Sequence, residues 1–176
     1  MRITERATVV YLKRPDGCFC LAPKKGNIHK AKGEELKGTA DKLNGYGGKQ
    51  KFAQTILQTA ISELFEESSV RAGERDLELV GRINFFWPDN DTTQPDMIVD
   101  FFFISVYQGE PRETVEMGPP EWFLPENFPY DRMNKADKYF LPSIFKGEKK
   151  VLDIFHGKTR EDGTPLIVDK EIAPTL

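Results

Sequence analysis

The stretch GKQKFAQTILQTAISELFEESSV, residues 48–70, decides the fold class of this chain. Apolar residues recur in it at the spacing of one helical face and predict an amphipathic helix over residues 55–68. Thr55 has the side chain of an N-cap, and Gln58 three residues later completes a capping-box pattern. The apolar positions are Ile56, Leu57, Ala60, Ile61 and Leu64. A tight glycine cluster, GYGG over residues 45–48, comes just before this helix.

Three acidic residues of the predicted helix, Glu63, Glu66 and Glu67, stand at positions i, i+3 and i+4 and therefore face one side. Their charges repel one another, and the C-terminal end of the helix dipole disfavours each by about 0.3–1 kcal/mol. A hard divalent cation relieves this repulsion, because Mg²⁺ prefers oxygen ligands. Taken alone, the acidic residues fit an ordinary solvated helix face better. The glycine cluster upstream changes the balance, because carboxylates, a metal ion and a glycine loop together suit phosphate chemistry.

The sequence on either side of this segment predicts strands and a second helix. Residues 7–12 and 18–22 flank the turn at residues 14–17 and predict a hairpin. Residues 97–107 form a long apolar run that predicts a central strand. Further strands are expected at residues 77–87 and 121–124, and a closing hairpin at residues 151–155 and 166–168. A second helix is expected at residues 135–145, where Pro142 limits its extent, so the elements together predict a mixed α/β sandwich.

The composition is ordinary for a soluble protein. With 176 residues the chain is long enough for one hydrophobic core, so a single domain over residues 1–176 is expected. The formal net charge of −3 argues against a general nucleic-acid coat protein, and no stable nucleic-acid binding is expected. No apolar run approaches the roughly 20 residues that span a bilayer, and the N-terminus lacks a signal-peptide cleavage pattern. Cys18 and Cys20 are expected to be free thiols, which suits the cytoplasm.

A polar segment over residues 24–43 is expected to be a long loop, with a short helical turn at residues 34–36. It is rich in lysine and glycine. Two interpretations stay open: its lysines face phosphate groups, or the loop is simply solvated and flexible. The lysines in question are Lys24, Lys25, Lys30 and Lys32.

The stretch at residues 48–70 resembles the Nudix box, G-x5-E-x7-R-E-U-x-E-E-x-G-U, in which U is a bulky apolar residue. The matching positions are Gly48, Glu63, Leu64, Glu66, Glu67 and Val70. Gln54 replaces the first glutamate of the box, Ser62 replaces the arginine and Ser69 replaces the late glycine. The first glutamate and the arginine of the box are both absent here, so neither charged residue is left without its partner. Ser69 is expected to end the helix with a positive φ, less comfortably than glycine would.

The resemblance covers nearly the whole chain and points to one branch of the family, the MutT homologues that hydrolyse oxidised purine nucleoside triphosphates. LNGYGGK, residues 43–49, is similar to W-N-G-F-G-G-K of that branch. Shorter similarities follow in the same order, at residues 24–25, 80–85, 116–117, 122–123, 139–142 and 155–166. The resemblance implies a Nudix-type α/β/α sandwich with a mixed β-sheet, and Mg²⁺ as the cofactor with Mn²⁺ as an alternative.

The resemblance also implies roles for individual residues. Glu63, Glu66 and Glu67 are implied to be catalytic, either binding the metal or activating water. The implied metal ligands are Gly47 through its carbonyl, Glu63, Glu66, Glu67 and Glu116. The implied substrate-binding residues are Asn44, Lys24, Thr8, Phe85, Trp87, Met97, Met117 and Asp137. For Phe85, Met97 and Met117 a plain core role is an equal alternative.

The function implied is hydrolysis of a nucleoside triphosphate to the monophosphate and pyrophosphate, with Glu66 or Glu67 accepting the proton of the attacking water. Asn134 and Ala136 depart from the base-recognition segment of the branch, which argues against a strict preference for 8-oxo-dGTP or 2-hydroxy-dATP. One alternative is therefore another nucleoside diphosphate derivative, such as a sugar nucleotide, a dinucleoside polyphosphate or a capped-RNA fragment. A second is a non-catalytic nucleotide-binding module, which the three box substitutions suggest. The expected partner is a small-molecule nucleotide, bound by a monomer or dimer away from membranes.

Overall fold

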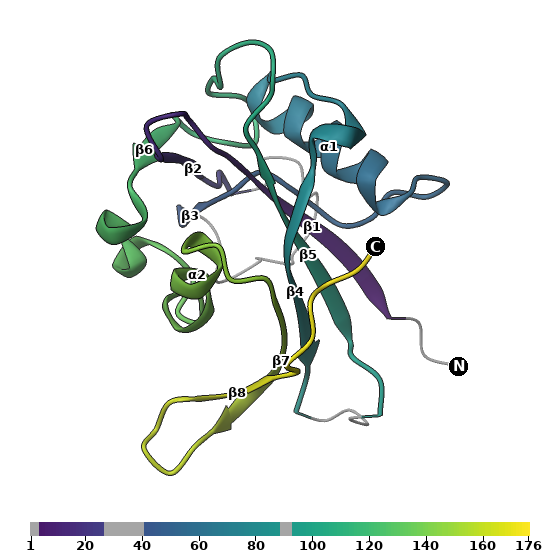
Figure 1. Ribbon diagram of the computed structural model, residues 1–176, viewed down its shortest axis with the longest axis vertical. Coiled ribbons are helices and arrows are strands. Elements are labelled where there is room, and N and C mark those ends of the chain that lie inside the picture. Colours follow the sequence, from purple (N-terminus) through teal and green to yellow (C-terminus); the bar gives the residue numbers. More distant parts are fainter. Residues whose placement is uncertain (1–3, 27–40, 89–92) are drawn as a thin grey trace.

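Five strands form a mixed sheet in the computed structural model, which describes residues 4–26, 41–88 and 93–176 (Figure 1). The strands are β1 (Glu5–Leu12), β4 (Glu78–Phe86), β5 (Met97–Ile104), β7 (Lys150–Thr159) and β8 (Pro165–Asp169). Their order is β1-β5-β4-β7-β8, with β1 parallel to β5 and β4 parallel to β7. The pairs β4–β5 and β7–β8 are antiparallel, which confirms the predicted closing hairpin. Strand β5 lies inside the sheet, as its apolar run predicts.

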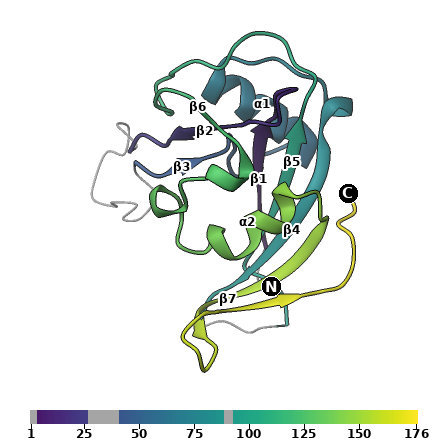
Figure 2. The same ribbon diagram turned by 60° about the vertical axis from the view of Figure 1, so that its left-hand side comes forward.

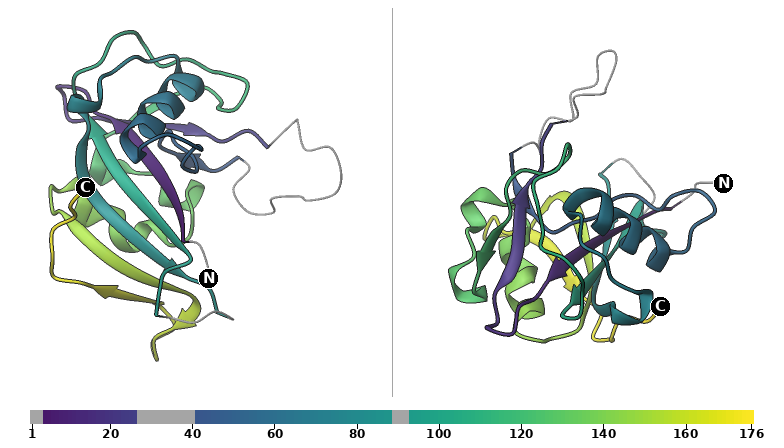
Figure 3. Two further views of the ribbon diagram at one scale, coloured as in Figure 1. Left: turned by 90° about the vertical axis from the view of Figure 1, so that its right-hand side faces the viewer. Right: turned by 90° about the horizontal axis from the view of Figure 1, so that it is seen from above.

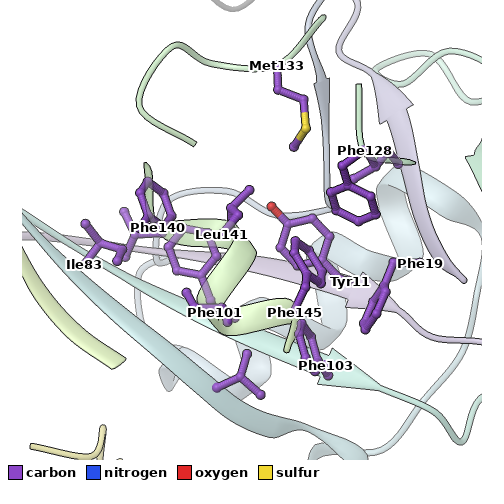
Figure 4. Packing of buried hydrophobic residues seen from close by; sticks show 14 of the residues in the cluster. Tyr11, Phe19, Ile83, Phe101, Phe103, Phe128, Met133, Phe140, Leu141 and Phe145 are labelled. Atoms are coloured by element: carbon purple, nitrogen blue, oxygen red, sulfur yellow. The ribbon is translucent and has the colours of Figure 1, made fainter. Parts of the chain in front are cut away.

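Two helices cover opposite faces of this sheet (Figures 2 and 3). Alternate residues of a strand point to opposite faces, so each strand contributes to two separate cores. On one face Val10 and Phe102 pack in the same cluster as Leu64 of α1 (Ile56–Ser68). On the other face Tyr11 and the neighbouring strand phenylalanines pack with α2 (Asp137–Phe145), as Figure 4 shows. The predicted α/β/α sandwich is therefore confirmed.

Helix α1 begins and ends as its sequence predicts. The Thr55 hydroxyl accepts a hydrogen bond from the Gln58 backbone N–H at 3.1 Å, and the Gln58 side chain accepts one from the Thr55 N–H at 3.0 Å. This reciprocal pair is the predicted capping box. At the other end Ser69 adopts φ 64° and donates its N–H to the Phe65 carbonyl. A serine thus takes the left-handed position that glycine fills more easily.

The predicted hairpin between the first two strands is wrong. Strand β2 (Phe19–Pro23) belongs to a separate three-stranded sheet, between β3 (Leu43–Asn44) and β6 (Glu121–Phe123). It meets the end of β1 only through an isolated bridge between Lys13 and Phe19. The reason is that both edges of β1 are already occupied, one by β5 and the other by the glycine segment, which bridges β1 at Val10–Tyr46.

The remaining predictions differ from the structure in detail. Helix α2 begins at Asp137, two residues later than predicted, and it contains Pro142. Short 3₁₀ helices lie at Glu74–Asp76, Pro125–Asn127 and Tyr130–Arg132. The predicted helical turn at residues 34–36 and the lysines at positions 30 and 32 lie outside the described residues. In the described part of the chain no helix has the length and apolar character needed to cross a bilayer.

Candidate active site

The glycine segment lies along the edge of β1 opposite β5 and brings the backbone against α1. Tyr46 and Val10 exchange two backbone hydrogen bonds of 2.6 and 2.9 Å, and the Thr8 N–H donates to the Gly48 carbonyl at 2.9 Å. A Cβ atom on Gly47 would lie 2.0 Å from the Thr8 carbonyl oxygen, and one on Gly48 would lie 2.6 Å from Glu63 Oε2. Position 47 therefore requires glycine, because a side chain there would push the segment away from the β1 backbone, whereas a side chain at position 48 would displace the Glu63 carboxylate.

Glu67 is the buried member of the acidic set. Its side chain is 1% exposed, and its Oε2 accepts a hydrogen bond from the Gly47 N–H at 2.7 Å. Lys24 Nζ lies 3.4 Å from Glu67 Oε1 and donates to the Gly47 carbonyl at 3.5 Å. Burial raises the pKa of Glu67 to about 7, although Lys24 and the Gly47 N–H act in the opposite direction. A carboxyl group with this pKa suits proton transfer near neutral pH.

Glu63 and Glu66 share one cation, the ammonium group of Lys51. Lys51 Nζ lies 2.9 Å from Glu63 Oε1 and 2.7 and 2.8 Å from the two oxygens of Glu66. The Glu63 side chain is 12% exposed, whereas that of Glu66 is 51% exposed. The repulsion expected from the sequence is thus relieved by a residue of the loop before α1. Glu63 and Glu67 lie against the glycine segment rather than pointing into open solvent.

The donor atoms of this site suit a hard divalent cation. Within the described ranges no three acidic, histidine or cysteine side chains converge closely enough to form a ready-made metal cage. Yet four of the five implied donors already face a positive charge: Glu63 and Glu66 face Lys51, while Glu67 and the Gly47 carbonyl face Lys24. All four donors supply oxygen, which is the ligand type that Mg²⁺ and Mn²⁺ prefer. The residues present therefore fit such an ion.

The two box substitutions at positions 54 and 62 contact each other. The Ser62 hydroxyl donates to Gln54 Oε1 at 3.4 Å, and the Thr59 hydroxyl donates to the same oxygen at 3.1 Å. Lys51 also connects loop and helix, since its N–H donates to Thr59 Oγ1 at 3.2 Å. Neutral hydrogen bonds thus join the loop to α1 at the positions where the Nudix box has two charged residues.

The loop before β6 carries Glu116 and Met117. Its Thr114 hydroxyl donates to the Glu67 backbone carbonyl at 3.2 Å, which ties the loop to the end of α1. The Glu116 side chain is exposed, and its carbonyl accepts the Lys25 N–H at 2.8 Å. Met117 is fully buried in the core on the α1 side of the sheet. It therefore lies on the other side of the sheet from the apolar residues expected to line the pocket.

Three of the predicted substrate-binding residues come together at the α2 side of the sheet. Phe85 and Met97 are opposite each other in the β4–β5 register and are only partly buried. The Trp87 ring lies 5.9 Å from the Phe85 ring and is 36% exposed. Thr8 does not join them, because it is paired with Asp100 and points to the opposite face. Its hydroxyl is buried and has no hydrogen-bond partner among the described residues.

Asp137 and Asn44 lie on the same side as Tyr11 and form a polar cluster with it. Asp137 is 8% exposed, its Oδ2 accepts the Asn134 N–H at 3.1 Å, and burial raises its pKa to about 6. Asn44 Oδ1 accepts the Gly45 N–H at 2.8 Å and the Tyr11 hydroxyl at 3.4 Å. Burial, and next the charge of Asp137, raise the pKa of Tyr11. The cluster offers hydrogen-bonding groups beside an aromatic surface.

Two contributors were not predicted from the sequence. Lys51 lies within the Nudix-like stretch, 11 positions before Ser62, and the available signal was a basic residue close to a box that lacks its arginine. Tyr130 carries a buried hydroxyl that has no hydrogen-bond partner in the described part of the chain. Burial, followed by the charge of Asp137, raises its pKa to about 12. No pattern in the sequence marks Tyr130, because only the fold brings it near Asp137.

Two vertebrate enzymes are similar in sequence to this chain. No protein-family model matches the chain. An oxidized purine nucleoside triphosphate hydrolase of Danio rerio is 32% identical over 133 residues, which cover 76% of this chain and 78% of the relative. The enzyme of the same name from Mus musculus is also 32% identical, over 111 residues that cover 62% of this chain and 67% of the relative.

Solved structures show the same fold at lower sequence identity. A MutT protein from Bacillus halodurans superposes with a TM-score of 0.65 at 16% identity, covering 94% of this chain and 97% of its own. A MutT Nudix hydrolase from Burkholderia pseudomallei gives a TM-score of 0.61 at 15% identity, covering 83% of this chain and 98% of its own. The similarity to these two structures supports the fold alone.

Proposed function

The chain belongs to the Nudix hydrolases, and from this premise we propose that it hydrolyses a nucleoside triphosphate to the monophosphate and pyrophosphate, with Mg²⁺ as cofactor. Its membership makes it a hydrolase of phosphoric anhydrides. The names of the vertebrate relatives favour a nucleoside triphosphate as the substrate. The observation that carries the proposal is the contact between the buried Glu67 carboxylate and the Gly47 N–H, beside Glu63 and Glu66.

In the proposed mechanism the metal ligands are Glu63, Glu66, Glu67 and the Gly47 carbonyl. A divalent cation held there neutralises phosphate charge and makes water more acidic. Glu67 accepts the proton of the attacking water, because it is buried, oriented by the Gly47 N–H and has a raised pKa. In the metal-free protein Lys24 holds the Glu67 carboxylate and the Gly47 carbonyl in place, since its ammonium lies within 3.5 Å of both. Glu116, whose exposed side chain belongs to the loop that Thr114 ties to the end of α1, is proposed as a further ligand.

The base of the nucleotide is proposed to bind at the α2 side of the sheet. Phe85, Met97 and Trp87 supply an apolar and aromatic surface, and Asn44 and Asp137 supply hydrogen-bonding groups. A carboxyl group whose pKa is about 6 donates a hydrogen bond when protonated and accepts one when ionised. We therefore propose a purine substrate, without the strict selectivity that a second carboxylate at position 136 would give.

Two other functions remain as competitors. Hydrolysis of a sugar nucleotide, a dinucleoside polyphosphate or a capped-RNA fragment is favoured by Asn134 and Ala136, which replace base-recognition residues. A non-catalytic binding module is favoured by the substitutions at positions 54, 62 and 69. The hydrogen bonds that join Gln54 to Ser62 and Thr59 argue against the second, because they preserve the loop–helix connection without the missing charges.

The experiment is a substrate panel assayed with and without Mg²⁺ or Mn²⁺. The panel contains the normal deoxynucleoside triphosphates, 8-oxo-dGTP, 2-hydroxy-dATP, a sugar nucleotide and a dinucleoside polyphosphate, with separate detection of pyrophosphate and orthophosphate. Metal-dependent pyrophosphate release from a purine triphosphate supports the proposal. Turnover confined to the diphosphate compounds supports the first competitor. Ligand-induced thermal stabilisation without any metal-dependent product supports the binding module.

A further inference from the structure

Lys51 occupies the position between two of the proposed metal ligands. Its Nζ contacts Glu63 Oε1 at 2.9 Å, both oxygens of Glu66 at 2.7 and 2.8 Å, and the Ser62 hydroxyl at 3.4 Å. Because Glu63 is largely buried, this ammonium is its main source of compensating charge in the described part of the chain. The contact is therefore a fixed feature of the loop before α1 and not a transient ion pair on the surface.

An ammonium group and a divalent cation cannot hold these oxygens together. Mg²⁺ binds carboxylate oxygens at about 2.0–2.1 Å and demands near-octahedral geometry. An ammonium that keeps hydrogen bonds to the same oxygens would lie only a few ångströms from the ion, where the two positive charges repel strongly in a partly buried site. Binding of the metal to Glu63 and Glu66 thus requires that Lys51 move away.

We propose that Lys51 is a tethered competitor of the divalent cation, and that it sets how much metal the Glu63–Glu66 pair requires. The inference rests on the metal site of the proposed function. Because Lys51 belongs to the same chain, its effective concentration at the carboxylates is high and does not vary with conditions. Before the metal binds, its positive charge reduces the repulsion between the two carboxylates. Because it must be displaced by the metal, it also lowers the apparent affinity of the site for the metal. A purely structural lysine would stabilise the fold and leave metal affinity unchanged.

The test compares Lys51→Met with Lys49→Met. Lys49 belongs to the same loop and loses the same charge, but its ammonium pairs with the exposed Glu5 at 2.9 Å. Mn²⁺ binding to metal-stripped protein is measured by electron paramagnetic resonance of the free ion. We expect Lys51→Met to bind Mn²⁺ about tenfold more tightly than the wild type, equivalent to about 1.4 kcal/mol. We expect Lys49→Met to change the affinity little, since its exposed charge is screened.

Equal or weaker Mn²⁺ binding by Lys51→Met overturns the proposal. Equal tightening in both variants also overturns it, because the effect would then come from net charge alone. The absence of Mn²⁺ binding in all three proteins overturns it as well. The first two outcomes leave the proposed function standing, whereas the third also removes its metal site. A protein that binds Mn²⁺ in the expected pattern yet releases no pyrophosphate would refute the catalytic proposal only.

A second measurement uses the wild-type protein and does not depend on a folded variant. Lysine amines are labelled with acetic anhydride with and without Mg²⁺, and the labelled peptides are quantified by mass spectrometry. Labelling of Lys51 is expected to rise severalfold on addition of Mg²⁺, because its ammonium is released from the carboxylates, while labelling of Lys49 stays constant. Unchanged labelling of Lys51 at saturating Mg²⁺ contradicts the displacement.

Discussion

The substitution Glu67→Gln separates catalysis from folding. Glutamine has the shape of glutamate, so its side-chain oxygen can still accept the Gly47 N–H that Glu67 Oε2 accepts at 2.7 Å. It carries no negative charge and cannot accept a proton from water. Loss of a general base typically lowers the rate by about 10²–10⁴-fold, or about 3–5 kcal/mol in the barrier. A decrease in kcat of this size is expected.

The stability of the same variant is expected to change little. Replacing a charge-assisted hydrogen bond by a neutral one costs about 1 kcal/mol. Removing a carboxylate that is 1% exposed relieves a desolvation cost of comparable size, and this cost is the cause of the raised pKa of Glu67. The free energy of unfolding should therefore stay within about 1 kcal/mol of the wild-type value.

The assay is steady-state pyrophosphate release with saturating Mg²⁺, and the stability is measured by urea denaturation of the same samples. Glu161→Gln is the matched control, because it makes the same chemical change on an exposed turn of the β7–β8 hairpin and should leave kcat unchanged. Near wild-type kcat in Glu67→Gln would refute the assignment of the base. A large loss of stability in that variant would show that the carboxylate charge holds the glycine segment in place.

Three further predictions concern folding and pH. Burial raises the pKa of Asp137 from its usual 3.8 to about 6, so its contribution to stability is fully present below about pH 4 and is lost as pH rises through 6. Between pH 4 and pH 8 the free energy of unfolding of Asp137→Asn should therefore rise by about 3 kcal/mol relative to that of the wild type, as measured by denaturant titration. Gly47→Ala places a Cβ 2.0 Å from the Thr8 carbonyl oxygen, so it should lower the free energy of unfolding by about 1–3 kcal/mol and reduce pyrophosphate release, and unchanged values would refute the close approach. Thr55→Ala removes the α1 cap and should cost about 1 kcal/mol with kcat preserved, whereas an unaltered melting temperature would speak against the capping box.

The local features of the fold could be predicted from the sequence because neighbouring residues determine them. The capping box of α1 depends on Thr55 and Gln58 alone, three residues apart. The positive φ of Ser69 follows from its place just after the last helical turn. The interior position of β5 follows from an apolar run without polar alternation.

Features that depend on distant segments were predicted less well. The turn after β1 indicated that β2 returns beside it, but the sequence could not show that the segment at residues 46–49 takes that edge of β1. A resemblance to a family matches residues along the sequence, but it does not show on which face of the sheet each side chain lies. Thr8 and Met117 were accordingly grouped with Phe85, although strand alternation and burial place them on the other side of the sheet.

The acidic residues of the site could be predicted because helical spacing fixes their common side. Their cationic partners could not be predicted, because Lys24 directly follows β2 and Lys51 lies in the loop before α1. The buried ion cluster of Asp100 with Arg6 and Arg82 was missed for the same reason, since three separate strands contribute to it. Charged residues inside otherwise apolar strands were the only sign of it in the sequence.

The most direct measurement of the central claim is phosphorus NMR of the products after Mg²⁺ is added to metal-stripped protein and a purine nucleoside triphosphate. Equal amounts of monophosphate and pyrophosphate are expected to form only after Mg²⁺ is added, and Glu67→Gln is expected to form neither at a comparable rate. Release of orthophosphate with a nucleoside diphosphate, or identical product formation with and without the metal, would contradict it.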